Sequence, residues 1–279
     1  MRKTYDLSAL RKKAVKIRKD ILTMLSEAGS GHTGGSLSTV EILVSLYYII
    51  MNVDPGRPGW KERDWFILSK GHGCPALYAI LADKGYFPQE ELKTLRKMGS
   101  RLQGHPQKGL PGVEISSGSL GQGLSISVGV AIGNRMDKIA SKIYCLMGDG
   151  ETNEGQVWEA AMTAAHYKLD NICAIIDYNK LQIDGFTCEV KDPGEVRHKW
   201  ESFGWEAFEV DGHDIGELAK VFVKAAKIKN KPQMIIAHTL KGKGVSFIEN
   251  KAEWHGVAPK KEELAKAIEE LTEAESRIK

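Results

Sequence analysis

The chain has 279 residues, of which 42% are hydrophobic and 27% are charged, as is usual for a globular protein. Its net charge is +3, and Lys and Arg are interspersed with Asp and Glu instead of forming a basic stripe, which argues against nucleic acid as a partner. No window approaches the roughly 18 uninterrupted apolar residues of a membrane span, and the N-terminal segment lacks the apolar region of a signal peptide, so we expect a cytoplasmic protein with no membrane partner.

The first half of the chain is predicted to be mainly helical. Apolar residues recur with helical spacing over 7–28, and a glycine-rich loop should follow over 29–38. Ser38 or Thr39 should then cap a helix over 40–51, which is apolar on all sides and therefore buried in the domain or under a partner subunit. The next elements are a short buried strand over 64–69, a loop and then a helix over 70–85, and a long loop over 99–123.

The second half alternates between helices and strands. Such alternation implies crossover connections, and it predicts an α/β fold with a mostly parallel central sheet covered by helices on both faces. Without a repeat, a linker or a clear boundary, we expect residues 1–279 to form a single domain that ends in a charged helix at about 260–279. The alternating elements are helix 124–136, strand 143–147, helix 153–167, strand 172–178, strand 205–210, helix 215–227 and strand 233–239.

The four cysteines are scattered and form no CxxC pair. Two of them lie inside apolar strand patterns, so we expect small buried side chains rather than disulfides or a metal site. They are Cys74, Cys145, Cys173 and Cys188.

Two predicted strands end in oxygen-bearing side chains, Asp149 and Asn179. In an open parallel sheet, ligands bind where the strands end. Gly148 and Gly150 flank the carboxylate and allow a sharp turn whose N–H groups can face an anion. One carboxylate, one amide oxygen and a nearby backbone carbonyl suit Mg²⁺ or Ca²⁺ bound to phosphate oxygens. This predicts a site for a metal-bound diphosphate, whereas an isolated GDG would more simply be a turn, with Asn179 as a helix cap.

Four of the eight histidines adjoin a glycine or proline in predicted loops. A loop histidine with a pKa near neutral can serve as an acid or a base. Each histidine alone could be structural, and only the shared setting favours a common site. Lys241 and Lys243 could either steer a phosphate or solvate a turn, and both readings stay open. The four candidate histidines are His32, His72, His105 and His255.

The stretch from Cys145 to Gly185 resembles the thiamine-diphosphate fingerprint, in which GDG is followed by an Asn. The surrounding sequence resembles that of transketolase. The resemblance extends in the family's order over residues 10–265. The other matching stretches are SGHTGGSLS, SKGHGCPALYA, GHPQKGLPGVEISSGSLGQGLSISVGVAIG, HTLKGKGVSF and WHGVAP.

The resemblance implies thiamine diphosphate as cofactor, with Mg²⁺ as its metal and Ca²⁺ or Mn²⁺ as substitutes. Asp149, Asn179 and the main-chain carbonyl of Leu181 would ligate the metal. The four loop histidines would surround the substrate and move protons, while Glu154 would face its symmetry mate in a dimer. The implied cofactor-binding residues are His72, Gly118, Leu120, Gly148, Gly150, Glu154, Asn179 and His255.

The resemblance also implies a two-chain enzyme. The family's catalytic glutamate for the aminopyrimidine ring and its substrate-phosphate clamp lie in a second half that has no counterpart here. We therefore expect the N-terminal, diphosphate-binding subunit of a split transketolase, active only with a pyrimidine-binding partner in an α₂β₂ assembly. The implied reaction moves a two-carbon unit from a ketose phosphate to an aldose phosphate, as in the pentose phosphate pathway.

One residue departs from the family pattern, because the family usually has proline where this chain has Thr33. Proline would fix the backbone at this position, so its absence would loosen the loop or adjust the pocket around His32. The alternatives are a carboligase component like 1-deoxy-xylulose-phosphate synthase, a two-chain 2-oxo-acid dehydrogenase, and a non-catalytic regulatory subunit.

Overall fold

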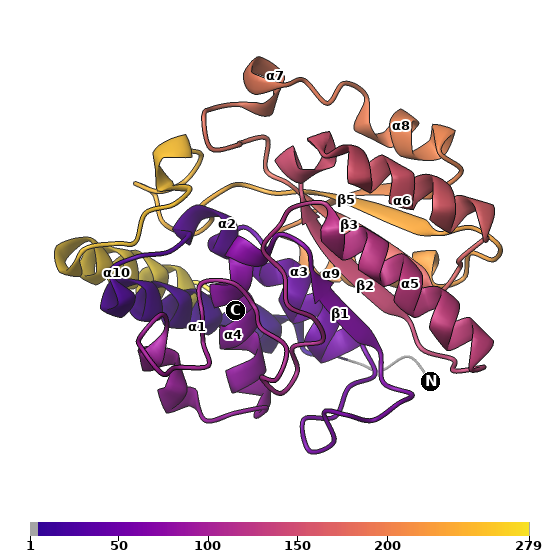
Figure 1. Cartoon of the computed structure of the whole chain (residues 1–279). Helices are drawn as coiled ribbons and strands as arrows, with labels where there is room; N and C mark the ends of the chain where they lie inside the picture. The colour runs from indigo at the N-terminus through magenta and orange to yellow at the C-terminus, as the bar shows by residue number, and fades with distance from the viewer. Residues whose placement is uncertain (1–4, 279) are drawn as a thin grey trace.

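The computed structural model describes residues 5–278 and is built around a five-stranded sheet (Figure 1). All neighbouring strands pair in parallel, in the order β1-β2-β3-β5-β4. The predicted α/β fold with a parallel sheet is therefore confirmed. The strands are β1 (Trp65–Leu68), β2 (Ile143–Gly148), β3 (Ile172–Tyr178), β4 (Glu206–Asp211) and β5 (Gln233–His238).

Helices cover both faces of the sheet, as predicted. Strand side chains alternate between the two faces, so that in β3 Ile175 joins one apolar core while Ala174 and Ile176 join the other. Figure 1 shows α5, α6 and α8 on one side of the strands and α1, α3, α4 and α9 on the other. Their bounds are α1 Leu7–Ala28, α3 Val40–Ser45, α4 Cys74–Lys84, α5 Gln122–Met136, α6 Gly155–His166, α8 Val196–Ser202 and α9 Ile215–Ala225.

Helix α1 has the predicted bounds. The carboxylate of Asp6 accepts the N–H groups of Ser8 and Ala9 at its start. Gly29 ends it with φ 65°, a left-handed conformation that glycine adopts without strain. The charged helix expected near the C-terminus is α10, Lys261–Ser276, which packs against α1 through buried Leu271 and an ion pair of 2.7 Å between Lys19 and Glu275.

The prediction of a loop over 29–38 is wrong in part, because residues Thr33–Leu37 form a short helix, α2. Glycine's low helix propensity conceals this turn in the sequence, yet the close approach of Lys241 requires a glycine at Gly34, while Gly35 lies at ordinary contact distance from its neighbours. A Cβ on Gly34 would lie 2.9 Å from Lys241 Cγ, and one on Gly35 would lie 3.5 Å from His72 Nε2. Tertiary contacts therefore override local propensity here.

The single helix predicted over 40–51 is divided. Thr39 precedes α3 without a side-chain cap, and a π-helical turn, η1, follows over Leu46–Ile50. The stretch Thr33–Ile50 has the length and mean hydropathy, 1.3, of a membrane span, but 83% of it is buried within the protein. Its apolar composition is explained by this burial, as predicted for 40–51.

Several short elements were not predicted, because pieces of three to seven residues carry too little periodicity. Between η3 and α5 the chain forms the expected long loop, without a helix or strand. Cys74, Cys145 and Cys173 are buried as predicted, whereas Cys188 in α7 is exposed, which contradicts the expectation for that residue. The unpredicted elements are 3₁₀ turns η2 (Gly71–Gly73), η3 (Gln89–Thr94), η4 (Gly150–Asn153) and η5 (Ala252–Trp254), and helices α7 (Thr187–Val190) and α8.

Candidate active site

A cavity of about 490 Å³, here called the main cavity, opens where β2 and β3 end. Every residue that the sequence predicted for the site lines it, although these residues come from stretches far apart in the chain. They are His32, His72, His105, Gly118, Leu120, Gly148, Asp149, Gly150, Glu154, Asn179, Leu181 and His255.

The predicted metal ligands lie on two adjacent turns. Gly148, the last residue of β2, pairs with Asp177 of β3, so Asp149 follows directly beside the turn that carries Asn179. Lys180 has a left-handed backbone, φ 64°, and its N–H donates to Asp149 Oδ2 at 2.5 Å. The two turns are thus bonded to each other at the cavity wall.

Asp149 is a buried carboxylate that faces no cationic partner in an ion pair within residues 5–278. Burial, together with the nearby charge of Asp177, raises its pKa to about 6. Only two backbone N–H groups, from Gly150 and Lys180, bond to it. A divalent cation would supply the missing positive charge, so the donor chemistry fits the predicted metal.

The other two predicted ligands also present oxygens here. Asn179 donates its amide nitrogen to Asp177 Oδ2 at 3.1 Å, which leaves Oδ1 at the opposite end, where it accepts the Leu181 N–H. The carbonyl of Leu181 lies 3.3 Å from the Lys241 ammonium inside the cavity. The Asp149 carboxylate, the Asn179 amide oxygen and the Leu181 carbonyl therefore belong to residues that line the same cavity. No group of three or more His, Cys, Asp or Glu side chains within residues 5–278 could hold a metal instead.

One detail of the glycine turn differs from the prediction. The N–H groups of Gly148 and Gly150 were expected to be free to face an anion, but they bond to Glu151 Oε2 and Asp149 Oδ1, at 3.0 and 2.8 Å. The reason is that Glu151 is 2% exposed and needs donors, which also include the Ser69 hydroxyl and the Gly121 N–H. Glu151 therefore ties the Gly118–Gly121 loop to the turn.

Two buried lysines supply positive charge to the main cavity. Lys70 and Lys241 are each 1% exposed and both line it. Lys70 Nζ bonds to Asp177 Oδ2 at 2.5 Å and to the Gly35 carbonyl at 2.9 Å. Lys241 has no carboxylate partner among the described residues, and burial followed by repulsion from Lys70 lowers its pKa to about 8. A polyanion bound here would relieve that repulsion.

Sequence analysis missed Lys70 and left Lys241 undecided. Lys70 could have been found, because it follows directly after β1 at the same edge of the sheet as Asp149. Lys241 could not, since its position depends on contacts with segments far away in the chain.

The four predicted histidines converge at the mouth of the main cavity. The ring centroid of His32 lies 5.2 Å from that of His72, 5.6 Å from that of His255 and 6.3 Å from that of His105. His255 Nδ1 accepts a hydrogen bond of 2.7 Å from the Lys241 ammonium, so its proton is carried on Nε2.

Burial is the largest cause that lowers the pKa of all four imidazoles. The pKa of His32 falls to about 4 and that of His255 to about 3, with further lowering by nearby cations, Arg96 for His32 and Lys241 for His255. The pKa values of His72 and His105 are lowered as well. All four rings are thus neutral at pH 7, and they are weaker bases than the near-neutral loop histidines expected from the sequence, because burial disfavours the charged imidazolium.

The remaining predicted residues form the wall of the cavity. A Cβ on Gly118 would lie 3.6 Å from the His105 ring, so this glycine lets the loop approach the histidine. Glu154 is exposed and precedes α6. Its expected contact with a symmetry mate stays a prediction.

His213, which was not predicted as a site residue, bonds to the backbone next to Lys241. His213 Nε2 accepts the N–H of Leu240 at 2.8 Å, and its Nδ1 bonds to Glu41 Oε2 at 2.9 Å. Arg18 pairs with the same buried carboxylate and donates to the Lys243 carbonyl at 2.8 Å. This network holds the backbone on both sides of Lys241.

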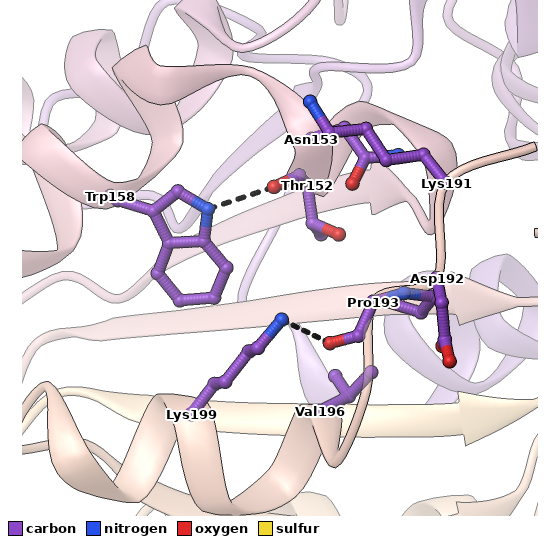
Figure 2. Close-up of a pocket in the computed structure, with 8 residues that line it drawn as sticks. All are labelled: Thr152, Asn153, Trp158, Lys191, Asp192, Pro193, Val196 and Lys199. Atoms are coloured by element: carbon purple, nitrogen blue, oxygen red, sulfur yellow. Dashed lines mark hydrogen bonds between the residues drawn. The ribbon is translucent and has the colours of Figure 1, made fainter. Parts of the chain in front are cut away.

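A smaller pocket of about 250 Å³ shares Asn153 and Lys191 with the main cavity. Figure 2 shows the Trp158 indole nitrogen directed at the Thr152 carbonyl and the Lys199 amine at the Pro193 carbonyl. These groups are already bonded, and none of the predicted site residues lines this pocket.

Comparisons with known proteins agree with this geometry. Residues 10–275 match the family described as transketolase, thiamine diphosphate binding domain. The 6-deoxy-6-sulfo-D-fructose transketolase subunit SqwG of a Clostridium species is 46% identical over 91% of this chain and 93% of its own length. An apulose-4-phosphate transketolase subunit of Phocaeicola vulgatus is 43% identical over 96% of this chain and 95% of its own length.

Longer transketolases match as well. Human transketolase is 40% identical over 95% of this chain, which spans 42% of the human protein. The crystal structure of the Campylobacter jejuni transketolase superposes with a TM-score of 0.91 and 34% identity, over 96% of this chain and 43% of that one. The chain therefore spans about two fifths of these longer relatives.

The fold and the site define the thiamine-diphosphate-binding part of an enzyme. The chain belongs to the transketolase family. The prediction of a transketolase, a transferase that moves ketol groups, is confirmed, and so is that of a thiamine-diphosphate-binding domain.

Proposed function

We propose that this chain holds the metal-diphosphate end of thiamine diphosphate and, with a second chain, transfers a two-carbon ketol unit from a ketose phosphate to an aldose phosphate. The observation that carries the proposal is the main cavity itself, where Asp149, Asn179 and the Leu181 carbonyl adjoin two buried lysines and four neutral histidines.

Each group has a defined task in this reaction. Asp149, Asn179 and the Leu181 carbonyl would hold Mg²⁺, with Ca²⁺ or Mn²⁺ as substitutes, because all three present oxygen donors. The ammonium groups of Lys70 and Lys241 would neutralise the diphosphate. When bound, thiamine diphosphate supplies the electron sink for cleavage of the bond next to a substrate carbonyl.

The histidines would handle protons and orient the sugar. The rings are neutral near pH 7, and we assign acceptance of the donor hydroxyl proton to one of them. Because a lowered pKa makes the free imidazole a weak base, the bound anionic substrate and cofactor would have to raise the pKa of the ring that accepts the proton. The ring set around His32 is open at the mouth of the cavity, where a sugar chain would enter.

A second chain is part of the proposal. Relatives of this length are named as transketolase subunits. Two glutamates line the main cavity, but Glu151 is already bonded to Ser69, Gly121 and Gly148, and the resemblance assigns Glu154 to a dimer contact and places the glutamate for the aminopyrimidine ring in a second half of the enzyme. We assign that role to a pyrimidine-binding chain, in an α₂β₂ assembly. The same relatives act on sugars named as a phosphate or a sulfo derivative, so an anionic sugar is the substrate class, with pentose phosphates as one case.

The test is to identify the partner by co-purification and then assay the pair on ketose and aldose phosphates. The pair should transfer the ketol unit, lose activity after chelation and regain it with Mg²⁺, Mn²⁺ or Ca²⁺, whereas the lone chain should be inactive. Robust turnover by the lone chain would refute the two-chain proposal. A pair that binds the cofactor yet transfers no ketol unit would support the regulatory alternative.

A further inference from the structure

His32 and His255 meet across the main cavity although they lie at opposite ends of the chain. Their ring centroids are 5.6 Å apart and the rings are nearly perpendicular, at 85°. A Cβ on Gly256 would lie 3.9 Å from His32 Nε2. The segment after His255 therefore lies against the start of α2, where His32 stands.

The polypeptide before His255 is anchored in several ways. Trp254 is 8% exposed and its ring packs edge to face on Phe247, while the N–H of His255 donates to the Ala252 carbonyl at 2.8 Å. The imidazole itself accepts the Lys241 bond described above.

The polypeptide after His255 has a single polar anchor. Residues 256–259 lie outside helices and strands, and within the described part of the chain their one hydrogen bond runs from the Thr33 hydroxyl to the Val257 carbonyl, at 2.5 Å. Thr33 is fully buried, whereas Val257 is 48% exposed. The bond therefore joins an exposed stretch, Gly256 and Val257, to a residue inside the protein, while Ala258 and Pro259 after it pack against the core.

Thr33 is the position at which the resemblance to transketolase implies a proline. Thr33 is the first residue of α2, where proline fits a helix well, so the backbone does not require threonine. Proline has no hydroxyl and could not bond to Val257. The threonine thus adds a contact between two segments instead of merely loosening one.

We propose that Thr33 is a positioning residue whose hydroxyl ties the segment after His255 to α2 and so keeps His255 facing His32. The tie is a property of the chain alone, while its effect on catalysis rests on the proposed function. Removing the hydroxyl should free residues 256–258 and widen the spread of distances between the two rings.

The measurement is ¹⁵N relaxation of the Gly256, Val257 and Ala258 amides in the intact chain, with the nuclear Overhauser effect between the ring protons of His32 and His255. The wild-type order parameters should be near the rigid value of about 0.85. In Thr33→Val, which keeps the shape and loses the hydroxyl, they should fall below about 0.6 and the ring contact should weaken. Thr33→Ser should retain the wild-type values.

Ser36→Ala is the matched control. Its hydroxyl donates to the His32 carbonyl within α2 at 2.6 Å and makes no contact with Val257, so its loss should leave residues 256–258 rigid. Should Thr33→Val fail to fold, Thr33→Pro removes the same hydroxyl at a position that accepts proline.

Rigid amides in Thr33→Val or Thr33→Pro, or mobile amides in the wild type, would overturn the tie. Mobile amides in a folded Thr33→Ser would do the same, because the hydroxyl would then not be the anchor. With the partner present, Thr33→Val should lower kcat/KM about tenfold and Thr33→Ser should restore it. If the wild-type chain and its partner transferred no ketol unit, the proposed function would be refuted. The relaxation measurement would still show whether the Thr33 hydroxyl anchors residues 256–258.

Discussion

The backbone N–H of Lys180 donates a hydrogen bond to the carboxylate of Asp149, 31 positions earlier in the chain. This bond fixes the relation between the two turns that end β2 and β3. It brings the predicted carboxylate, amide and carbonyl ligands to one wall of the main cavity, where Lys70 and Lys241 add positive charge.

The first prediction concerns the metal. Asp149→Ala should abolish the Mg²⁺-dependent part of thiamine-diphosphate binding, because no other carboxylate among the predicted ligands can replace it. Calorimetry of the assembled pair with and without Mg²⁺ measures this. Asp170→Ala, at the other end of the sheet, is the control and should bind as the wild type does. Undiminished Mg²⁺-dependent affinity in Asp149→Ala would contradict the assignment.

The second prediction concerns pH and the stability of the chain without cofactor. The folded-state pKa of Asp149 is raised to about 6 by burial and by Asp177, so its favourable contribution is complete below the unfolded pKa, near 4, and is lost as the pH rises through about 6. Asp149→Asn should therefore exceed the wild type in free energy of unfolding at pH 8, by about 3 kcal/mol.

Urea unfolding of both proteins between pH 4 and pH 8 checks this, and the difference between them removes the contribution of the histidines. That difference should vanish below about pH 4. A difference that does not change with pH would contradict the raised pKa.

The third prediction concerns Lys70 and Asp177. Asp177 is 0% exposed, and although burial opposes it, the Lys70 ammonium lowers the pKa of this carboxylate. Lys70→Met would leave a buried charge without its cation and should lower the free energy of unfolding by about 3–5 kcal/mol. Lys70→Met combined with Asp177→Asn should recover part of that loss.

Urea denaturation provides the measurement, with Lys220→Met as the control. Lys220 pairs with Glu217 on the surface, so its loss should leave the free energy of unfolding almost unchanged. An equal, small effect of both lysine substitutions would show that the buried pair does not stabilise the fold.

The fourth prediction concerns the network behind Lys241. His213→Phe leaves the Leu240 N–H without its acceptor and should weaken thiamine-diphosphate binding about tenfold, since Lys241 is the next residue. If His213 acts through Lys241, the effect should disappear in a Lys241→Met background. Calorimetry on the four proteins of this double-mutant cycle measures whether the two substitutions are coupled. If their effects on the binding free energy simply add, His213 has a purely structural role.

The strands could be predicted from the sequence because buried parallel strands are short apolar runs bounded by polar or glycine residues, and this placed β2 and β3 to within a residue. Helix α2 could not be predicted, since its two glycines oppose helix formation, and the close approach of Lys241 that requires Gly34 is visible only in the structure.

Some site residues could likewise be predicted from the sequence, whereas others could not. Asp149 and Asn179 stand at strand ends, and parallel pairing alone brings them together. The bond between Thr33 and Val257 and the contact of Lys241 with His255 join residues through the tertiary fold, and no local pattern marks them. The bond from the Gly148 N–H to Glu151 also depends on the tertiary fold, because the buried Glu151 carboxylate needs hydrogen-bond donors.

The most direct test of the account is anomalous diffraction from crystals of this chain with its partner, grown with thiamine diphosphate and MnCl₂. The account predicts a manganese peak at coordination distance from Asp149, Asn179 and the Leu181 carbonyl, with diphosphate oxygens completing the shell. A bound cofactor whose manganese lies away from these three oxygens would contradict it.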